Sequence, residues 1–167
     1  MDLAPIIQNP WHVQLHVLTA VLAFLVGPFA IMRRSRDIWH KVFGYIWVTA
    51  MLITALTSFW IFGFRLIGPF SPIHGLSIYV LWSLASAIWH VRNGNIAEHR
   101  ATMLQLYLWA VCVTGLATLL PGRSMNLALL GGADGVLSYA AVGLAICGVI
   151  FVYFRRVLPL GKAKHLH

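Results

Sequence analysis

Histidine is the residue type best suited to do chemistry in this chain. The 167 residues include eight histidines, and six of them lie in or at the edge of long apolar stretches. A neutral imidazole can bind a metal ion or a haem iron through a ring nitrogen, whereas a protonated one cannot. The six side chains therefore predict a cofactor site. They divide between the two halves of the expected helices, with His12, His16 and His74 in one half and His40, His90 and His99 in the other.

The positions of these histidines favour the neutral ring. His12, His40, His74 and His99 each fall in the first turn of an expected helix. The positive end of the helix dipole disfavours a charged imidazolium there. Neutral histidines at matched depths on different helices are what bis-histidine ligation of a b-type haem requires. His90 is a weaker candidate, because it lies at a helix C-terminus, where the charged form is favoured.

A weak internal repeat suggests how the histidines pair. The first and third apolar stretches begin alike, with NPWH at 9–12 and SPIH at 71–74. The second and fourth each begin with an acid followed by a histidine and a cation. Such a repeat predicts two helical hairpins related by a pseudo-twofold axis along the membrane normal. It places His12 opposite His74, and His40 opposite His99.

Copper is the alternative cofactor, because imidazole suits this metal as well. His12, His16 and His74 would form such a site together with Met125 if the loop that carries the methionine folds back onto the bundle. The spacing of these residues does not select copper over haem.

The helices that must position the histidines are expected to lie in a membrane. Hydrophobic residues make up 60% of the chain, only 10% are charged, and the mean hydropathy is +0.81. A soluble domain of this size could not cover its surface with so few charges. Five stretches are long enough to cross about 30 Å of hydrocarbon as helices. They cover residues 10–32, 38–62, 72–91, 96–120 and 135–154 of a single transmembrane domain, 1–167.

The cations predict the orientation. Ten of the twelve Lys and Arg residues flank one side of the five stretches, and only Arg65 and Arg123 flank the other. This positive-inside bias predicts an outside N-terminus and a cytoplasmic C-terminus in a bacterial inner membrane. The net charge of +8 is therefore attributed to topology, and nucleic acid is not an expected partner.

Several function classes are disfavoured by what the apolar stretches lack. The four carboxylates leave no acid in the membrane interior for a proton relay or a cation pathway. The sequence also has no Gly-rich phosphate loop and no nucleophile elbow, so enzyme activity is left unassigned. The carboxylates are Asp2, Asp37, Glu98 and Asp134.

Four other polar side chains have minor expected roles. Gln105 and Tyr107 lie near His99 in the fourth stretch and are candidates to contact a quinone head group. Cys112 and Cys147 are not part of a CxxC motif, so they predict no disulfide framework and no zinc site. They are expected to be small buried packing residues.

Five motifs follow one another along the chain: QLH at 14–16, WHKVFGY at 39–45, FSPIH at 70–74, GNIAEHR at 94–100 and LLPGR at 119–123. Their order resembles a bacterial family of predicted inner-membrane proteins classed as a domain of unknown function, over about residues 10–155. The resemblance implies no activity, but it favours pairing His74 with His16 rather than with His12. The positions that match the family pattern are His16, His40, His74, His99 and Arg123.

We therefore expect an all-α bundle of five transmembrane helices that carries electrons with His-ligated haem b. His40 and His99 would hold one haem, and His16 and His74 a second. Arg123 would pair with a haem propionate, or else be an arginine that snorkels to the membrane interface. The alternative function is a cofactor-free accessory or assembly subunit of a larger membrane complex. Small residues on the fifth helix would then form a packing face, namely Ser138, Ala141, Ala145 and Gly148.

Overall fold

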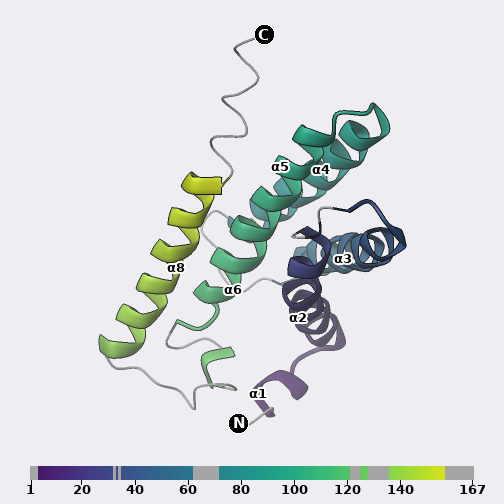
Figure 1. Cartoon of the computed structure of the whole chain (residues 1–167). Coiled ribbons are helices and arrows are strands. Elements are labelled where there is room, and N and C mark those ends of the chain that lie inside the picture. The colour runs from purple at the N-terminus through teal and green to yellow at the C-terminus, as the bar shows by residue number, and fades with distance from the viewer. Residues whose placement is uncertain are drawn as a thin grey trace.

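The computed structural model is built from α-helices with one 3-10 and one π segment, and it describes residues 4–31, 33, 35–61, 72–120, 125–127 and 136–156 (Figure 1). These residues contain no strand, which confirms the all-α class. Helices occupy the described parts of all five predicted stretches. The elements are α1 (Ala4–Ile7), α2 (Trp11–Ile31), α3 (Ile38–Thr57), η1 (Ser58–Trp60), α4 (Pro72–Arg92), α5 (Ile96–Leu106), the π-helix η2 (Tyr107–Val113), α6 (Thr114–Ala117) and α8 (Val136–Arg156).

Side-chain caps start two of these helices where the sequence predicts. The Asp37 carboxylate accepts a hydrogen bond from the His40 backbone N–H (3.0 Å) at the start of α3. The Asn95 side chain accepts one from the Glu98 backbone N–H (3.3 Å) at the start of α5. Each cap satisfies a backbone donor that the helix cannot pair internally. Each cap therefore fixes a first turn that leads into a candidate histidine.

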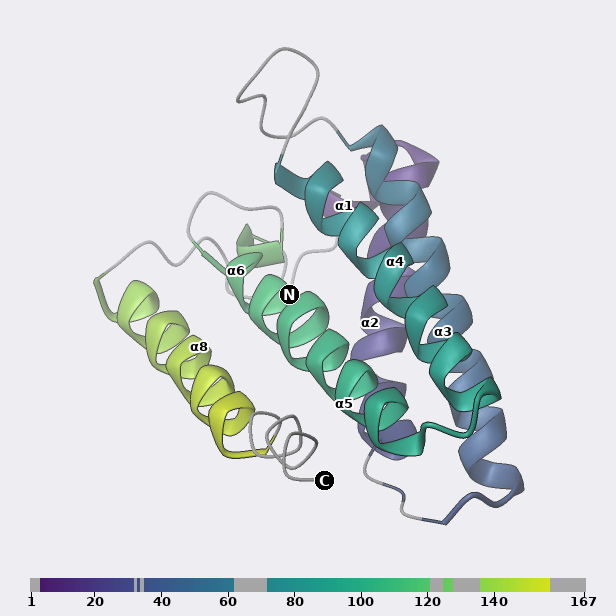
Figure 2. The same cartoon turned by 90° about the horizontal axis from the view of Figure 1, so that it is seen from above.

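Two helical hairpins form the bundle. α2 packs along α3, α4 packs along α5, and α3 joins the hairpins through its contacts with α4. α2 also contacts η2, which closes the four-helix arrangement seen in Figures 1 and 2. The hairpin pairing agrees with the two hairpins expected from the sequence. Side chains buried between the helices include Ala23, Trp47, Met51, Leu84 and Leu106.

Large apolar side chains cover the outside of the bundle as well as its core. Leu18, Phe29, Trp82 and Leu144 are each more than half exposed. Such a surface is expected where lipid rather than water surrounds the protein. Two helices, α2 and the continuous segment Ile38–Trp60, are long and apolar enough to cross a membrane by length and composition. The five crossings and their orientation stay predictions.

α8 lies on the outside of the four-helix arrangement, where it contacts η2 and α6 (Figure 2). Val142 is a buried residue of α8, whereas Ala141, Ala145 and Gly148 are exposed. The small-residue face therefore does not serve as the contact between α8 and the rest of the bundle. Cys147 is exposed as well, so its prediction as a buried packing residue is wrong. The other cysteine, in η2, is half-buried.

A proline inside α2 shapes the contact between α2 and η2. Pro28 has no backbone N–H, so the Phe24 carbonyl four residues earlier lacks its helical donor. The Tyr107 hydroxyl of η2 donates a hydrogen bond to that carbonyl at 3.1 Å. The proline thus creates an acceptor that ties η2 to α2.

Candidate histidine site at the basic end of the bundle

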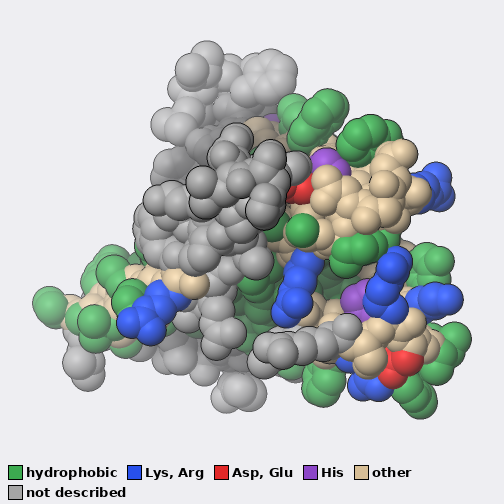
Figure 3. Space-filling model, turned by 45° about the horizontal axis from the view of Figure 1, so that its top comes forward, with side chains coloured by type: hydrophobic (Ala, Val, Ile, Leu, Met, Phe, Trp, Pro, Cys, Tyr) green, Lys and Arg blue, Asp and Glu red, His purple; other side chains and the backbone are tan. Residues whose placement is uncertain are grey.

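Most of the described cations lie at one end of the bundle. We call this the basic end and define it by Arg33, Arg36, Lys41, Arg92 and Arg100, which surround the starts of α3 and α5 and the end of α4. Figure 3, in which this end is turned toward the viewer, shows Lys, Arg and His side chains gathered between apolar patches.

An ion pair orders the connection that leads into α3. The Arg33 Nε donates to both carboxylate oxygens of Asp37, at 2.8 and 3.0 Å, and a second guanidinium nitrogen also contacts the carboxylate. The Arg33 hydrogen bonds and then the His40 backbone N–H hold the pKa of Asp37 well below its ordinary value. The cap of α3 therefore stays ionised at neutral pH, a negative charge at the positive end of the helix dipole.

Three histidines from three helices gather at the basic end. His40 lies in the first turn of α3, His90 in the last turn of α4 and His99 near the start of α5. His99 interacts electrostatically with both other histidines, and Arg36 acts on it as well. The structure thus places His40 and His99 at the same end of the bundle, with His90 and Arg36 also acting on His99.

A tight turn between α4 and α5 places His90 beside His99. Gly94 has a φ of 75°, a conformation that L-residues rarely adopt. The Asn95 N–H donates to the His90 carbonyl (2.9 Å), and the Gly94 N–H donates to the Val91 carbonyl (3.3 Å), which is the Schellman pattern of helix termination. His90 and His99 are almost equally far from Gly94 along the chain. That spacing is the sequence signal that could have shown their proximity.

The His99 ring is oriented as a metal ligand would be. Its Nδ1 lies 2.9 Å from the Ala87 carbonyl oxygen. A carbonyl oxygen only accepts, so Nδ1 carries the proton and donates it. The lone pair of the neutral ring is then on Nε2, which is left to bind a metal. Histidines that bind metals typically donate their second ring N–H to a carbonyl or carboxylate in this way.

The other two histidines of the basic end have unpaired nitrogens. The Nδ1 atoms of His40 and His90 are buried and have no hydrogen-bond partner among the described residues. Buried polar atoms are nearly always paired in native proteins, and exceptions point to strain, to a redox or catalytic role, or to a bound group. Both rings therefore carry a buried nitrogen that the described residues leave unpaired.

His16 belongs to a threonine network between α2 and α3, toward the opposite end of the bundle. Its Nδ1 lies 3.0 Å from the Thr54 carbonyl oxygen and 3.3 Å from the Thr57 hydroxyl. The Thr54 hydroxyl in turn donates to the Thr19 hydroxyl at 2.8 Å. Because the carbonyl accepts, Nδ1 of His16 carries the proton, as in His99.

His74 is buried on α4 beside η1. Its Nε2 lies 3.2 Å from the Phe59 carbonyl oxygen, and the two rings pack with their centroids 5.7 Å apart. His16 and His74 are thus held by two different carbonyls, one in α3 and one in η1. Because Nε2 of His74 donates to Phe59, binding iron through this nitrogen would require His74 to give up that hydrogen bond.

The remaining predicted ligands are spread over the structure. Among the described residues, no group of three or more His, Cys, Asp or Glu side chains is placed to hold one metal ion. The His12 ring lies edge-on to Trp11, with the centroids 5.8 Å apart, and Met125 is half-buried. Arg123, the predicted propionate partner, lies outside the described residues.

The two candidates for a quinone contact each have a partner within the protein. The Gln105 Nε2 donates to the Tyr79 hydroxyl at 2.8 Å. The Tyr107 hydroxyl donates to the Phe24 carbonyl. A quinone that bound either side chain would have to replace or share these hydrogen bonds.

The donor chemistry at the basic end fits a b-type haem. Two imidazoles come from different helices there, His99 with its Nδ1–H anchored on a carbonyl and His40 with a buried unpaired nitrogen. Two imidazoles from different helices of one bundle are a donor set that haem iron accepts. The donor set at the opposite end fits less well, because the hydrogen bond of His74 occupies Nε2.

The fold and its apolar surface are those of an α-helical membrane protein. The chain belongs to the family described as "Predicted membrane protein (DUF2306)", whose model matches residues 13–158. This match confirms the resemblance inferred from the order of motifs, and the family has no assigned function. No curated protein and no solved structure matches the chain.

Proposed function

We propose that this protein is a small membrane cytochrome-like electron carrier that holds haem b at its basic end, with His40 and His99 as the axial ligands. The observation that carries the proposal is that these two histidines lie at the same end of the bundle on different helices, near enough for His40 to act electrostatically on His99, with the His99 Nδ1–H anchored on the Ala87 carbonyl. Haem b, when bound, supplies a one-electron iron couple that the side chains do not provide. The basic end would face the cytoplasm of a bacterial inner membrane that the chain crosses five times.

The surrounding residues would support this role by orientation and charge. The Ala87 carbonyl holds the His99 ring, and the Asp37 cap fixes the turn that carries His40. Arg36 acts electrostatically on His99, and its guanidinium would be a candidate partner for an anionic propionate. Arg36 thereby takes at this end the role that the sequence suggested for Arg123.

The test is optical spectroscopy of the protein purified in mild detergent from haem-replete cells. We expect a Soret band that shifts on reduction with dithionite and about one haem per chain. His40→Ala and His99→Ala should each abolish the band. His12→Ala is the matched control, because it removes a first-turn histidine of α2 and should leave the spectrum unchanged. A colourless wild-type preparation would refute the proposal, as would variants that retain full haem content.

A second spectroscopic comparison tests whether His16 and His74, toward the opposite end of the bundle, hold a further haem. The double variant His16→Ala/His74→Ala should keep the whole Soret band if the basic end holds the only haem. Loss of about half of the haem would instead support the two-haem arrangement expected from the sequence.

The second candidate function is a cofactor-free accessory subunit of a larger membrane complex. The observation that favours it is the exposure of Ala141, Ala145 and Gly148 on α8, because small residues let transmembrane helices approach closely. This function predicts co-purification with a larger assembly and no bound metal by elemental analysis. Ala145→Leu should then disrupt the assembly, whereas Val136→Ile, at an exposed site on the opposite side of α8 from Ala145, should not.

A further inference from the structure

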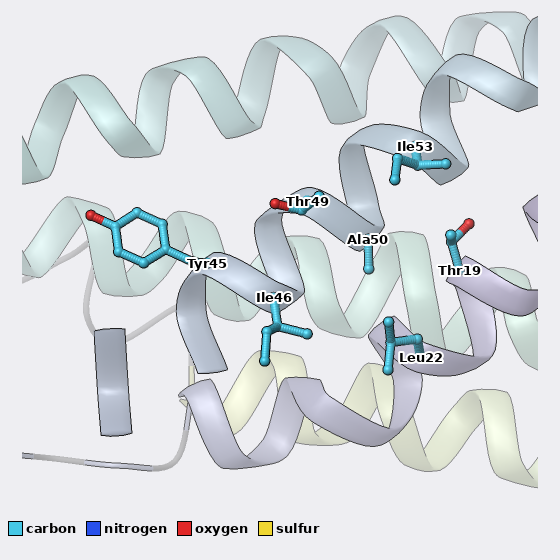
Figure 4. A pocket seen from close by; sticks show the side chains of 7 residues that line it. All are labelled: Thr19, Leu22, Tyr45, Ile46, Thr49, Ala50 and Ile53. Carbon is cyan, nitrogen blue, oxygen red and sulfur yellow. The ribbon is translucent and has the colours of Figure 1, made fainter. Parts of the chain in front are cut away.

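An elongated groove runs along the outer surface where α2 and α3 pack. Figure 4 shows Tyr45 at one end of it and Ile53 and Thr19 at the other. Leu22, Ile46 and Ala50 lie between these ends. Most of the lining is aliphatic, and both helices are the ones long and apolar enough to cross a membrane. If these helices cross the membrane, the groove would open toward the hydrocarbon of the bilayer.

The floor of the groove has no polar group that requires a ligand. Ala50 has no side-chain atom beyond Cβ, so it leaves a hollow between the larger Ile46 and Ile53. The Thr19 hydroxyl donates to the Leu15 carbonyl at 2.9 Å and accepts from Thr54 at 2.8 Å. A floor whose hydroxyl is already paired favours a hydrocarbon occupant over a polar one.

The groove leads to a cation at the basic end. Lys41 lies one turn before Tyr45 on α3, so the two side chains are neighbours on the helix surface. At 1.5 Å per residue the distance from Tyr45 to Ile53 is about 12 Å, close to the thickness of one leaflet at about 15 Å. Lys41 lies about 6 Å beyond Tyr45 along α3. If α3 crosses the bilayer, a groove of this length would cover most of one leaflet, with a cation one turn beyond its Tyr45 end.

Lys41 is available to an anion from the membrane. It is exposed, and among the described residues it makes no ion pair, whereas Arg33 is neutralised by Asp37. Tyr45 is 75% exposed beside it, and its phenol has the amphipathic character that suits the head-group region.

We propose that the groove between α2 and α3 binds one anionic glycerophospholipid, with an acyl chain lying over Ala50 and the phosphate at Lys41. Charge complementarity selects this lipid over a zwitterionic one, because the cationic end of the groove would attract a net negative head group. The inference is independent of the haem proposal, since it uses none of the histidines.

The experiment is native mass spectrometry of the full-length protein in detergent, with equal amounts of phosphatidylglycerol and phosphatidylcholine of identical acyl chains. The wild type should retain one phosphatidylglycerol in clear preference to phosphatidylcholine. Lys41→Gln should reduce phosphatidylglycerol retention about fivefold, the effect of one cation near an anionic head group. Arg100→Gln removes an exposed cation at the same end but away from the groove, and it should leave retention unchanged.

A second variant tests the hydrocarbon part of the site without disturbing the core. Thr49 is an exposed groove residue, so Thr49→Phe should fill the groove and lower retention of the lipid. Leu52→Phe adds an aromatic ring at an exposed position of α3 outside the groove lining and is the control. Equal retention of the two lipids, or equal loss in Lys41→Gln and Arg100→Gln, would overturn the proposal. The proposal would also be overturned if the protein were a dimer that Thr49→Phe dissociates but added phosphatidylglycerol does not. The groove would then bind a second copy of the chain.

Discussion

The ring of Tyr107 lies directly against the backbone of Gly27. A Cβ atom added at Gly27 would overlap Cε2 and Cδ2 of this ring. The same tyrosine donates its hydroxyl hydrogen to the Phe24 carbonyl, which Pro28 leaves without a helical donor. One aromatic side chain thus fills the space that a glycine leaves and satisfies the acceptor that a proline creates. The contact joins α2 to the π-helix η2, and π segments often occur at functional sites.

Gly27→Ala should destabilise the protein, because the tethered Tyr107 ring cannot move aside without losing its hydrogen bond. Overpacking of this kind costs about 1–3 kcal/mol. Gly44→Ala is the control, since a Cβ atom there meets nothing within 4 Å and alanine favours a helix by about 0.5–1 kcal/mol. In thermal unfolding measured in detergent, the Tm should therefore be lower for Gly27→Ala than for the wild type and slightly higher for Gly44→Ala. An unchanged Tm for Gly27→Ala would contradict the close approach.

Tyr107→Phe should cost about 1 kcal/mol, because it leaves the Phe24 carbonyl without a donor. In a Pro28→Ala background the backbone N–H of residue 28 becomes available to that carbonyl, so the same substitution should cost less. The two single variants and the double variant form a cycle that isolates this coupling. Strictly additive effects on unfolding would show that the contribution of the Tyr107 hydroxyl does not depend on the acceptor that Pro28 leaves unpaired.

Acid should weaken the start of α3 through Asp37. The pKa of this carboxyl is lowered in the folded protein, first by the Arg33 hydrogen bonds and then by the His40 backbone N–H. A group with a lowered folded-state pKa stabilises the fold above its unfolded value of about 3.9 and loses that contribution as the pH falls toward the folded value. The Tm should therefore fall more steeply from about pH 5 to about pH 3 in the wild type than in Asp37→Asn. The asparagine variant keeps a cap acceptor but does not titrate, and parallel profiles for the two proteins would refute the assignment.

Gly94→Ala should strain the turn that places His90 beside His99. A positive φ costs an L-residue about 1–2 kcal/mol, whereas asparagine tolerates it better. We expect unfolding measurements to show the highest stability for the wild type with Gly94, an intermediate stability for Gly94→Asn and the lowest for Gly94→Ala. Gly115→Ala, whose added Cβ meets nothing within 4 Å, should not lose stability. If the alanine variant at 94 were as stable as the wild type, the turn would not need its left-handed residue.

The sequence predicted the helical stretches and the starts of α3 and α5, because these depend on local patterns. Hydropathy over about 20 residues marks a segment that can cross a membrane. Asp37 and Asn95 cap the turn that follows them whatever the rest of the chain does. The short link around Gly94 is also visible in the sequence, and it brings the start of α5 next to the end of α4. The proximity of His90 and His99 could therefore have been predicted from their spacing.

The rest was decided by how the helices are rotated and packed against one another. The sequence does not show that the Nδ1–H of His99 donates to Ala87, or that Nε2 of His74 donates to Phe59. Nor does it show that the small face of α8 is exposed, or that Tyr107 reaches α2. An apolar helix surrounded by lipid has weak amphipathic patterning, so hydropathy alone does not fix its rotation about its axis. Which nitrogen of a histidine remains available is therefore set by the carbonyls that tertiary packing brings within reach.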